Sequence, residues 1–471
     1  MAVYGRKRKM SGYVKLFMTL MLLAGLGYGY YKIEEFRNRI NDDKILAQSV
    51  LKDKKFAATV QEINVGKISA YLLEEHSNPI ISISFVFKNA GTAYEPEQQQ
   101  GLANILADML LQGTRNYSNE NFKDTSEEYG VKIGYDAGKD SFGGSLSYPK
   151  ANEKTAINLF RETLYAPAFR EKYLELSKMQ LLKALQMANE RPERVLSNKF
   201  AEFMFGGHPY SRPGIGRAQD IETLTADDLR QYMQTHFAQD NLIVGIAGDI
   251  NAEETKNLLN NLFGKLPQIS ETKALKPLDV VTSGDSQHIE RNMPQTIVHF
   301  AAKGTYRDSL DFYPLYMANY IFGEAGLNSR LNKVIREKEG LTYGIYTGLS
   351  ISDASALIVG SYSATTENYA KVQDLLFEQW RKMAAEGVSE KELQQAKDAQ
   401  LASYNLRFAS IENIADMLVM MQKFELGIDF LDKRNDYIRG VTLREVNAAA
   451  KKYFSDLPDF VSIGKQIKEN K

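Results

Sequence analysis

Arg336 and Tyr343 stand seven positions apart and are the side chains of this sequence whose spacing points most directly to a chemical role. A guanidinium is a fixed fork of hydrogen-bond donors and a phenol is a directional donor, so together they suit carbonyl oxygens and oxyanions. Apolar spacing predicts a helix that ends at Gly340, and residues 341–346 are predicted to form a strand. The two side chains are therefore predicted to lie close together. Standing alone, such a pair is more often an exposed arginine and a core tyrosine.

A second stretch that could carry chemistry is the amphipathic segment from Gly101 to Thr114. Its apolar face is formed by Leu102, Ile105, Leu106, Met109 and Leu110. Asn104 and Asp108 share the opposite, wetter face. Two oxygen ligands fall short of the about six to eight that calcium takes. The residues alone therefore favour a solvated helix face over a cation site.

The run around Arg336 resembles the substrate-binding Arg/Tyr pair of the pitrilysin/insulinase family of zinc peptidases. It reads R-E-K-E-G-L-T-Y from 336 to 343, and it comes after S-R-L at 329–331 and the turn F-G-E-A-G at 322–326. In that family the pair lies in the half of the enzyme without metal and reaches across to hold substrate backbone and steady the tetrahedral intermediate. The resemblance covers nearly everything from Phe56 to Lys465 and implies that Arg336 and Tyr343 bind substrate.

The segment 101–114 resembles the inverted zincin helix of active family members, G-L-A-H-x-L-E-H-M-L-x-x-G-T, in which two histidines bind zinc and a glutamate activates water. Here Asn104 and Asp108 stand at the histidine positions and Ala107 at the glutamate position. The family's third ligand is a glutamate on a later helix, and the matching run places Ala184 there. The resemblance therefore implies a degenerate site, with no metal and no other cofactor in this chain.

The other residues offer no replacement site. Cys is absent, which excludes disulfides, thiolate zinc sites and a cysteine nucleophile. No two histidines stand three or four residues apart, the spacing that places two ligands on one turn of a helix; they are His76, His208, His236, His288 and His299. His208 lies in G-G-H-P-Y-S-R-P, which is similar to a loop-closing segment of the family. It is expected to bond to backbone and to have no catalytic part.

An internal repeat predicts the architecture. Thr225 caps a predicted helix that ends at Phe237 before a strand, and Thr442 caps one that ends at Phe454 before a strand. The predicted fold is α+β with two homologous halves, and the family resemblance implies that they are of the metalloenzyme LuxS/pitrilysin-like type. Each half is expected to be a mostly antiparallel sheet with helices on one face, and an N-terminal membrane segment precedes them.

The front of the chain is predicted to enter a membrane. R-K-R-K at 6–9 precedes an apolar run whose uncharged part extends from Leu16 to Tyr31. The positive-inside rule places the residues after this run on the periplasmic side of a bacterial inner membrane. A poor cleavage site favours a retained anchor over a cleaved signal peptide. If the signal peptide were cleaved, the protein would be free in the periplasm.

These signals divide the chain into five parts. They are a signal peptide or signal anchor (1–31), a charged stalk (32–55), an N-terminal peptidase-like domain with the degenerate zinc helix (56–270), a linker (271–284) and a C-terminal peptidase-like domain with the Arg/Tyr pair (285–471). A hydrophobic content of 44% is ample for large cores. With 58 basic and 59 acidic residues the net charge is -1, so nucleic acid is not an expected partner.

Loss of the zinc residues with retention of the Arg/Tyr pair resembles the non-catalytic subunit of the family's two-chain members. It implies a subunit of a zinc-dependent endopeptidase complex that binds an extended peptide, laid along a sheet edge, while a zinc-bearing subunit of the same family forms the other half of the heterodimer. The alternative is an inactive homologue that acts as scaffold or assembly factor of a membrane complex. An independent peptidase would need a metal site that these residues do not offer.

Overall fold

The computed structural model describes residues 59–404, 408 and 410–465. The predicted membrane segment (1–31) and the charged stalk (32–55) lie outside the described residues. Within the described part of the chain, no helix has the length and apolar character needed to cross a bilayer.

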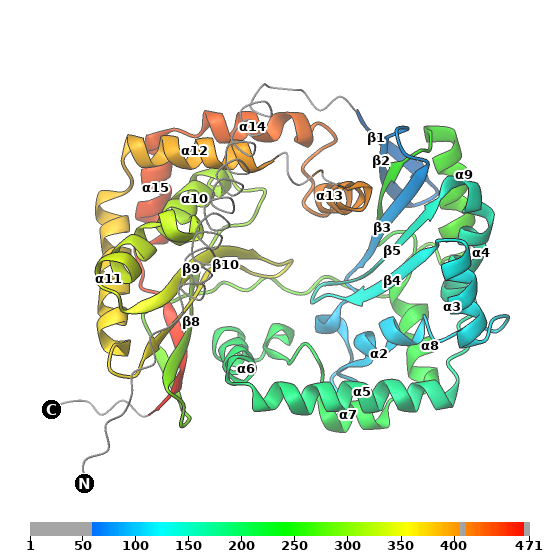
Figure 1. Ribbon diagram of the computed structural model, residues 1–471, viewed down its shortest axis with the longest axis horizontal. Coiled ribbons are helices and arrows are strands. Elements are labelled where there is room, and N and C mark those ends of the chain that lie inside the picture. Colours follow the sequence, from blue (N-terminus) through cyan, green and yellow to red (C-terminus); the bar gives the residue numbers. More distant parts are fainter. Residues whose placement is uncertain (1–58, 405–407, 409, 466–471) are drawn as a thin grey trace, which may run out of the picture. The chain divides into compact units, whose positions relative to one another are not determined.

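Two β-sheets form the framework of the described residues (Figure 1). The strands of the first half are β1 (Val60–Val65), β2 (Ile68–Glu74), β3 (Ile80–Lys88), β4 (Lys132–Ala137), β5 (Ser141–Pro149) and β6 (Leu242–Gly248). Those of the second half are β7 (Ser286–Glu290), β8 (Gln295–Lys303), β9 (Thr342–Ile351), β10 (Ala356–Thr365) and β11 (Asp459–Gly464). The spatial orders are β1-β2-β6-β3-β5-β4 and β7-β11-β8-β10-β9.

The second sheet repeats the first strand by strand. When β1 is set aside, the order β2-β6-β3-β5-β4 corresponds to β7-β11-β8-β10-β9. In both sheets the neighbours are antiparallel except for one pair, β2 with β6 and β7 with β11. The predictions of an α+β fold, of two halves built alike and of mostly antiparallel sheets are confirmed.

Both halves carry several helices in addition to their strands. Those of the first half are α2 (Leu102–Met109), α3 (Asn119–Glu128), α4 (Glu153–Tyr165), α5 (Glu171–Glu190), α6 (Pro192–Phe205), α7 (Ala218–Thr223), α8 (Ala226–His236) and α9 (Ala252–Phe263). Those of the second are α10 (Phe312–Asn319), α11 (Tyr369–Glu386), α12 (Glu390–Tyr404), α13 (Ile411–Lys423), α14 (Phe430–Gly440) and α15 (Leu443–Tyr453).

The predicted helix caps are present in both halves. Thr225 begins α8 and Thr442 begins α15, and each hydroxyl accepts a backbone N–H three residues later at 3.3 Å. The carboxylate of that later residue accepts the threonine's backbone N–H in return, which completes a capping box. The helices end before Phe237 and Phe454, as the repeat predicts.

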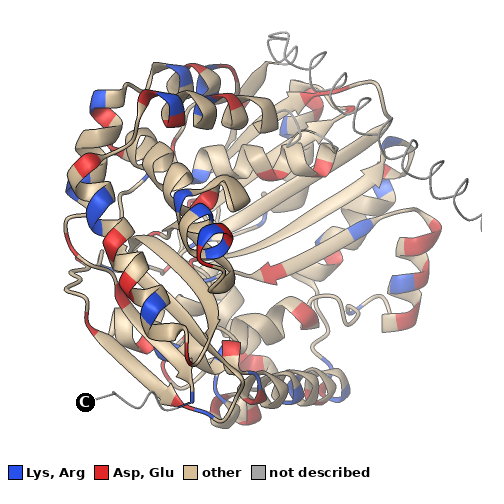
Figure 2. Cartoon of the chain, turned by 60° about the vertical axis from the view of Figure 1, so that its left-hand side comes forward, with Lys and Arg blue, Asp and Glu red and all other residues tan. Residues whose placement is uncertain are grey.

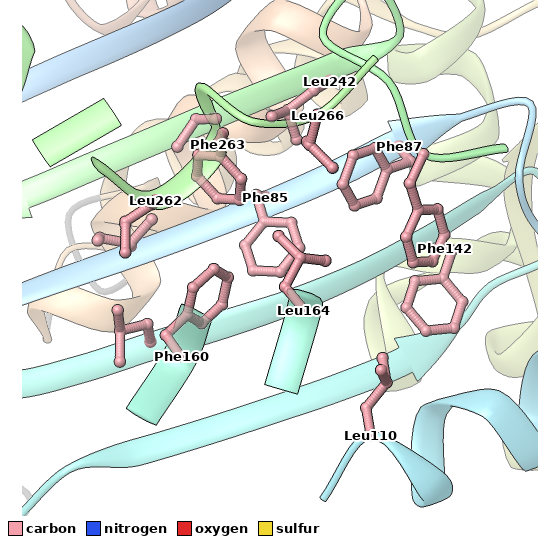
Figure 3. Packing of buried hydrophobic residues seen from close by; sticks show 14 of the residues in the cluster. Phe85, Phe87, Leu110, Phe142, Phe160, Leu164, Leu242, Leu262, Phe263 and Leu266 are labelled. Atoms are coloured by element: carbon pink, nitrogen blue, oxygen red, sulfur yellow. The ribbon is translucent and has the colours of Figure 1, made fainter. Parts of the chain in front are cut away.

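The core of the first half lies between its sheet and its own helices (Figure 3). The ring of Phe85 on β3 lies 5.5 Å from that of Phe160 on α4 and 5.3 Å from that of Phe263 on α9. Phe87 stacks on Phe237 at 4.3 Å. Such aromatic contacts add to the burial of large apolar surfaces, so they fix which helices can cover this face of the sheet.

Each sheet is covered on its second face by a helix from the other half. α13 packs on β3 and β6, where Leu418 is fully buried against Ala247. Figure 1 shows α13 on the side of this sheet opposite α4 and α9. In return, α6 packs on β8 and β11, where Leu196 meets Val461. The expectation that each sheet has helices on one face is therefore incomplete. The second face of each sheet is covered as well, because α6 and α13 bury their apolar residues against the sheet of the other half.

The exchanged helix α13 approaches the sheet closely. A Cβ at Gly245 would lie 2.2 Å from the carbonyl oxygen of Ala415, so only glycine allows this distance. Gln422 Nε2 also donates to the carbonyl oxygen of Val244 over 2.7 Å. The second half is thus bound to the first through backbone contacts as well as side chains.

Charge is distributed evenly over the helices in view (Figure 2). Lysine and arginine alternate with aspartate and glutamate along the same elements, in keeping with a net charge of -1. Neighbouring opposite charges cancel each other's field beyond a Debye length of about 8 Å, so this side of the protein presents no large field of one sign.

Shortening a buried side chain of the exchanged helix α13 should destabilise the whole folded unit. We expect Leu418→Ala to lower the free energy of unfolding by about 2–5 kcal/mol, because a fully buried leucine leaves a cavity. Urea unfolding of the full chain measures it. The control, Met179→Ala, removes a side chain that is 62% exposed and should change the value by about 0.5 kcal/mol or less. Equal effects of the two variants would show that α13 is not part of the core.

Candidate functional site

Arg336 lies on η6 (Asn332–Lys338), a π-helical segment. Leu331 and Ile335 anchor it in the second core, and Gly340 ends it with φ of 66°. The backbone N–H of Glu339 donates to the carbonyl of Val334, five residues back, which is the spacing of a π-helix. The predicted helix and its glycine stop are confirmed, and its turns are wider than the expected α-helix.

Tyr343 lies at the start of β9, the edge strand of the second sheet, and its side chain is 80% exposed. Arg336 is half-buried. Among the described residues, neither side chain has a hydrogen-bond or ion-pair partner. A tyrosine this exposed contributes little to a core, so the alternative in which Tyr343 is a core residue is wrong.

Arg330, six residues before Arg336, differs in this respect. Its guanidinium binds Glu392 through two hydrogen bonds of 2.6 and 2.8 Å. This arginine holds the pKa of Glu392 down to about 2. Arg330 therefore joins the segment to α12, whereas Arg336 makes no such bond to a described residue.

The degenerate helix α2 has hydrogen bonds where the family has zinc ligands. Asn104 Nδ2 donates to the carbonyl oxygen of Gly214 over 2.9 Å. Asp108 Oδ1 accepts from Gln112 Nε2 at 3.1 Å, and Gln112 Oε1 accepts from Asn119 at 2.7 Å. These bonds tie α2 to the loop before α7 and to the first turn of α3.

The residues at the family's zinc positions do not fit zinc. Ala107 is buried and Ala184 is exposed on α5, which packs against α2, and neither side chain has a donor atom for a metal. Asn104 offers only a neutral amide oxygen, and one oxygen of the Asp108 carboxylate already accepts from Gln112. Nowhere among the described residues do three His, Cys, Asp or Glu side chains gather in a group suited to a metal.

Glu95 supports the first turn of α2 from a buried position. Its carboxylate accepts the backbone N–H groups of Gly101 at 3.0 Å and Ala103 at 2.7 Å. Burial nevertheless raises the pKa of Glu95 to about 7, against the opposing effect of these bonds and of nearby Arg212. This role was not predicted from the sequence, since a single glutamate six residues before the glycine that begins a helix carries no recognisable signal.

The segment around His208 connects the two halves. His208 Nδ1 accepts the backbone N–H of Tyr210 at 3.2 Å, the backbone role expected of it. The hydroxyl of Tyr210 donates to Asp140 and accepts the backbone N–H of Ala354 at 3.0 Å. Asp353 N donates to the other oxygen of Asp140 over 3.2 Å. The turn between β9 and β10 is thus fixed on the first half, and the run G-G-H-P-Y-S-R-P was the signal that could have revealed it.

Restoring the four family residues should create a zinc site. We expect a variant with Asn104→His, Ala107→Glu, Asp108→His and Ala184→Glu to retain about one zinc per chain, because the i, i+4 pair and a third ligand then meet the needs of zinc. Zinc is measured by mass spectrometry after gel filtration. The control omits Ala184→Glu and should bind more weakly. A full equivalent of zinc in the unmodified chain would contradict the expectation that these positions are its missing ligands.

Replacing Glu95 should flatten the dependence of stability on pH. Between pH about 4.5 and 7 the folded chain holds a proton on Glu95 that the unfolded chain releases, so this group makes stability fall as pH rises through that window. The loss is about 3 kcal/mol and is complete above pH about 7. The free energy of unfolding is measured in urea at pH 5 and pH 7.5. Relative to the unmodified chain, the Glu95→Gln variant should be more stable at pH 7.5 than at pH 5. Parallel curves for the two proteins would contradict the raised pKa.

Comparisons with known proteins agree with this arrangement. The insulinase (peptidase family M16) model matches residues 71–217, and the peptidase M16 inactive domain model matches residues 223–400. The non-peptidase homolog YmxG of Helicobacter pylori is 26% identical over 398 residues, which are 83% of this chain and 90% of that protein.

Solved structures share the fold. A peptidase M16 inactive domain from Pseudomonas fluorescens aligns with a TM-score of 0.81 and 24% identity over 88% of this chain and 100% of that one. The periplasmic protease PqqL from Escherichia coli aligns with a TM-score of 0.75 and 18% identity over 88% of this chain and 48% of that one. The resemblance seen in the sequence is confirmed, and the chain belongs to the insulinase family of peptidases, family M16.

Proposed function

We propose that this chain is the substrate-binding, non-catalytic subunit of a zinc-dependent endopeptidase complex. The observation that carries the proposal is the Arg336/Tyr343 pair: the segment η6 is anchored in the second core, Tyr343 is 80% exposed, and no described residue bonds to either side chain. A zinc-bearing subunit of the same family would supply the metal and the cleavage chemistry. This chain would hold the peptide.

The loss of the metal residues and the retention of the pair support a division of labour. At the zinc positions, amide, carboxylate and methyl groups have replaced the ligands, and the polar ones are used in structural hydrogen bonds. The name of the Helicobacter pylori relative, a non-peptidase homolog, is consistent with a chain that does not cleave by itself. A chain kept only for its shape has no use for a phenol that is 80% exposed and for a guanidinium that no described residue pairs.

The bound species would be an extended peptide. Such a chain offers carbonyl oxygens that a guanidinium and a phenol can bind without reading side chains, so the pair suits peptides of varied sequence. On β9, the ring of the half-exposed Tyr346 lies over Gly344, where a Cβ would be 2.7 Å from it, whereas the space at Gly348 is open. A peptide can approach this face of the strand at Gly348 and stack on the ring of Tyr346.

We also propose a periplasmic location with an N-terminal membrane anchor. Its support is the basic cluster at 6–9 and the apolar run from Leu16 to Tyr31. One protein with this fold is described as a periplasmic protease.

The second candidate is a scaffold or assembly factor of a membrane complex, favoured by the same apolar run. Capture of the tagged full chain from its own membranes separates the two. The main partner under the first proposal is a family member with an intact H-x-x-E-H helix, whereas a large integral complex without such a chain would favour the scaffold.

Removing the pair should slow peptide cleavage by the complex without changing its zinc content. We expect Arg336→Ala to lower kcat/KM about 100- to 1000-fold and Tyr343→Phe about 10-fold, by analogy with the loss of donors to a developing oxyanion. Dye-labelled unfolded casein serves as the probe. The control Lys333→Ala removes an exposed cation from the same segment and should change the rate by no more than about two-fold. Unchanged rates for Arg336→Ala and Tyr343→Phe would end the proposal.

A further inference from the structure

Asn332 is a buried side chain that joins η6 to β9. It is 0% exposed, and its Nδ2 donates to the carbonyl oxygen of Ile345 over 2.7 Å. The backbone N–H of Ile345 donates in turn to Asn332 Oδ1 at 3.3 Å. The same amide group reaches Gly326 O at 3.0 Å and Ser329 Oγ at 3.1 Å. One side chain therefore links the turn before the helix, the helix and the strand.

The bonds to Ile345 replace a strand. In an antiparallel sheet every second residue of an edge strand points its N–H and C=O away from the neighbouring strand. At Ile345 the amide of Asn332 takes both groups, and at Thr347 the segment η4 (Tyr320–Glu324) lies so close that a Cβ on Gly323 would be 2.8 Å from the backbone nitrogen. A peptide cannot add to this part of β9, so the expectation of a peptide along a sheet edge does not apply to this strand.

The regular ladder is interrupted where Tyr343 stands. The register of β9 against β10 shifts between Tyr362 and Ala364, opposite the start of β9. Thr342 Oγ1 donates to Ser363 O over 2.6 Å there. A side-chain bond therefore joins the start of β9 to β10, where backbone hydrogen bonds join the rest of the two strands. The position of Tyr343 relative to η6 therefore depends on the side-chain bonds on either side of it.

We propose that Asn332 is a positioning residue that sets the separation and orientation of Arg336 and Tyr343. The inference rests on the proposed function, because it assigns Asn332 a task only if the pair binds peptide. Asn332 lies about one helical turn before Arg336 and bonds the strand two residues after Tyr343. Leu331, Ile335 and Ile345 are fully buried in the second core. Loss of the amide should therefore loosen the pair while the fold persists.

The first test measures geometry and needs no activity. The chain has no cysteine, so Glu337→Cys and Tyr346→Cys place two spin labels on η6 and β9 without background. We expect Asn332→Asp to widen the distribution of spin–spin distances about two-fold in frozen solution, because a carboxylate repels the carbonyl of Ile345. Asn332→Ser, whose oxygen is too short to reach the strand, should act in the same direction and serves if Asn332→Asp folds poorly.

The matched control is Asn241, a buried asparagine of the first half. It is 4% exposed, donates to Lys88 O at 2.8 Å and His236 O at 2.7 Å, and accepts from Ala238 N at 3.1 Å. Asn241→Asp should cost comparable stability and leave the spin distances unchanged. An equal spread of distances in both variants, or none in either, would overturn the positioning role.

The second test uses the full complex and labelled casein. We expect Asn332→Asp to raise KM and lower kcat/KM about 10- to 100-fold, as a small misplacement of binding groups does, whereas Asn241→Asp changes them little. In a chain that already carries Arg336→Ala and Tyr343→Phe, Asn332→Asp should have no further effect. Additive losses would overturn the inference. If Arg336→Ala alone changes nothing, the proposed function fails, while the spin-label result still decides whether Asn332 sets the geometry.

Discussion

The burial of each sheet's second face by a helix from the other half is the constraint on which the rest of the structure depends. Leu418 and Met421 of α13 are fully buried against the first sheet, and each such side chain contributes about 1.5–3 kcal/mol through its removal from water. A half without its partner would expose this apolar face. The exchange also fixes the second half, and with it Arg336, on the half that carries α2, and the bond from Ala354 to Tyr210 completes the junction.

The two sites that carry chemistry in the family differ in this chain: the zinc positions on α2 make structural hydrogen bonds, and the Arg/Tyr pair around η6 does not. At α2, Asn104 and Asp108 have become members of an ordinary hydrogen-bond network that closes a loop. Both side chains are half-buried, and the bonds that they make hold a loop and the start of α3 against α2. Around η6 the structural bonds are made by Asn332 and Arg330, whereas Arg336 and Tyr343 bond to no described residue.

Local patterns in the sequence were sufficient to predict the helices and strands. They were insufficient to predict that α6 and α13 pack on the sheet of the other half. The caps at Thr225 and Thr442 and the stop at Gly340 depend on bonds within one turn, so the sequence predicts them. The destination of α13 depends on a sheet more than a hundred residues earlier, and periodicity says only that the helix has an apolar face. Asn332 was missed for the same reason, because an asparagine within a helix is unremarkable until Ile345 lies against it. The Arg/Tyr pair itself was found through a family motif and its binding role stays a prediction.

The parallel pairs β2–β6 and β7–β11 bear on the order in which the chain can fold. In each half the first strand of the pair is synthesised early and its neighbour comes last, as in the pairing of Ser69 with Ile243. Closing a loop of that length costs entropy before any bond compensates, and contacts so distant in sequence slow folding. Each half therefore completes its sheet only when its final strand has left the ribosome, and until then the incomplete sheet presents open edges that chaperones or rapid docking of the last strand must protect.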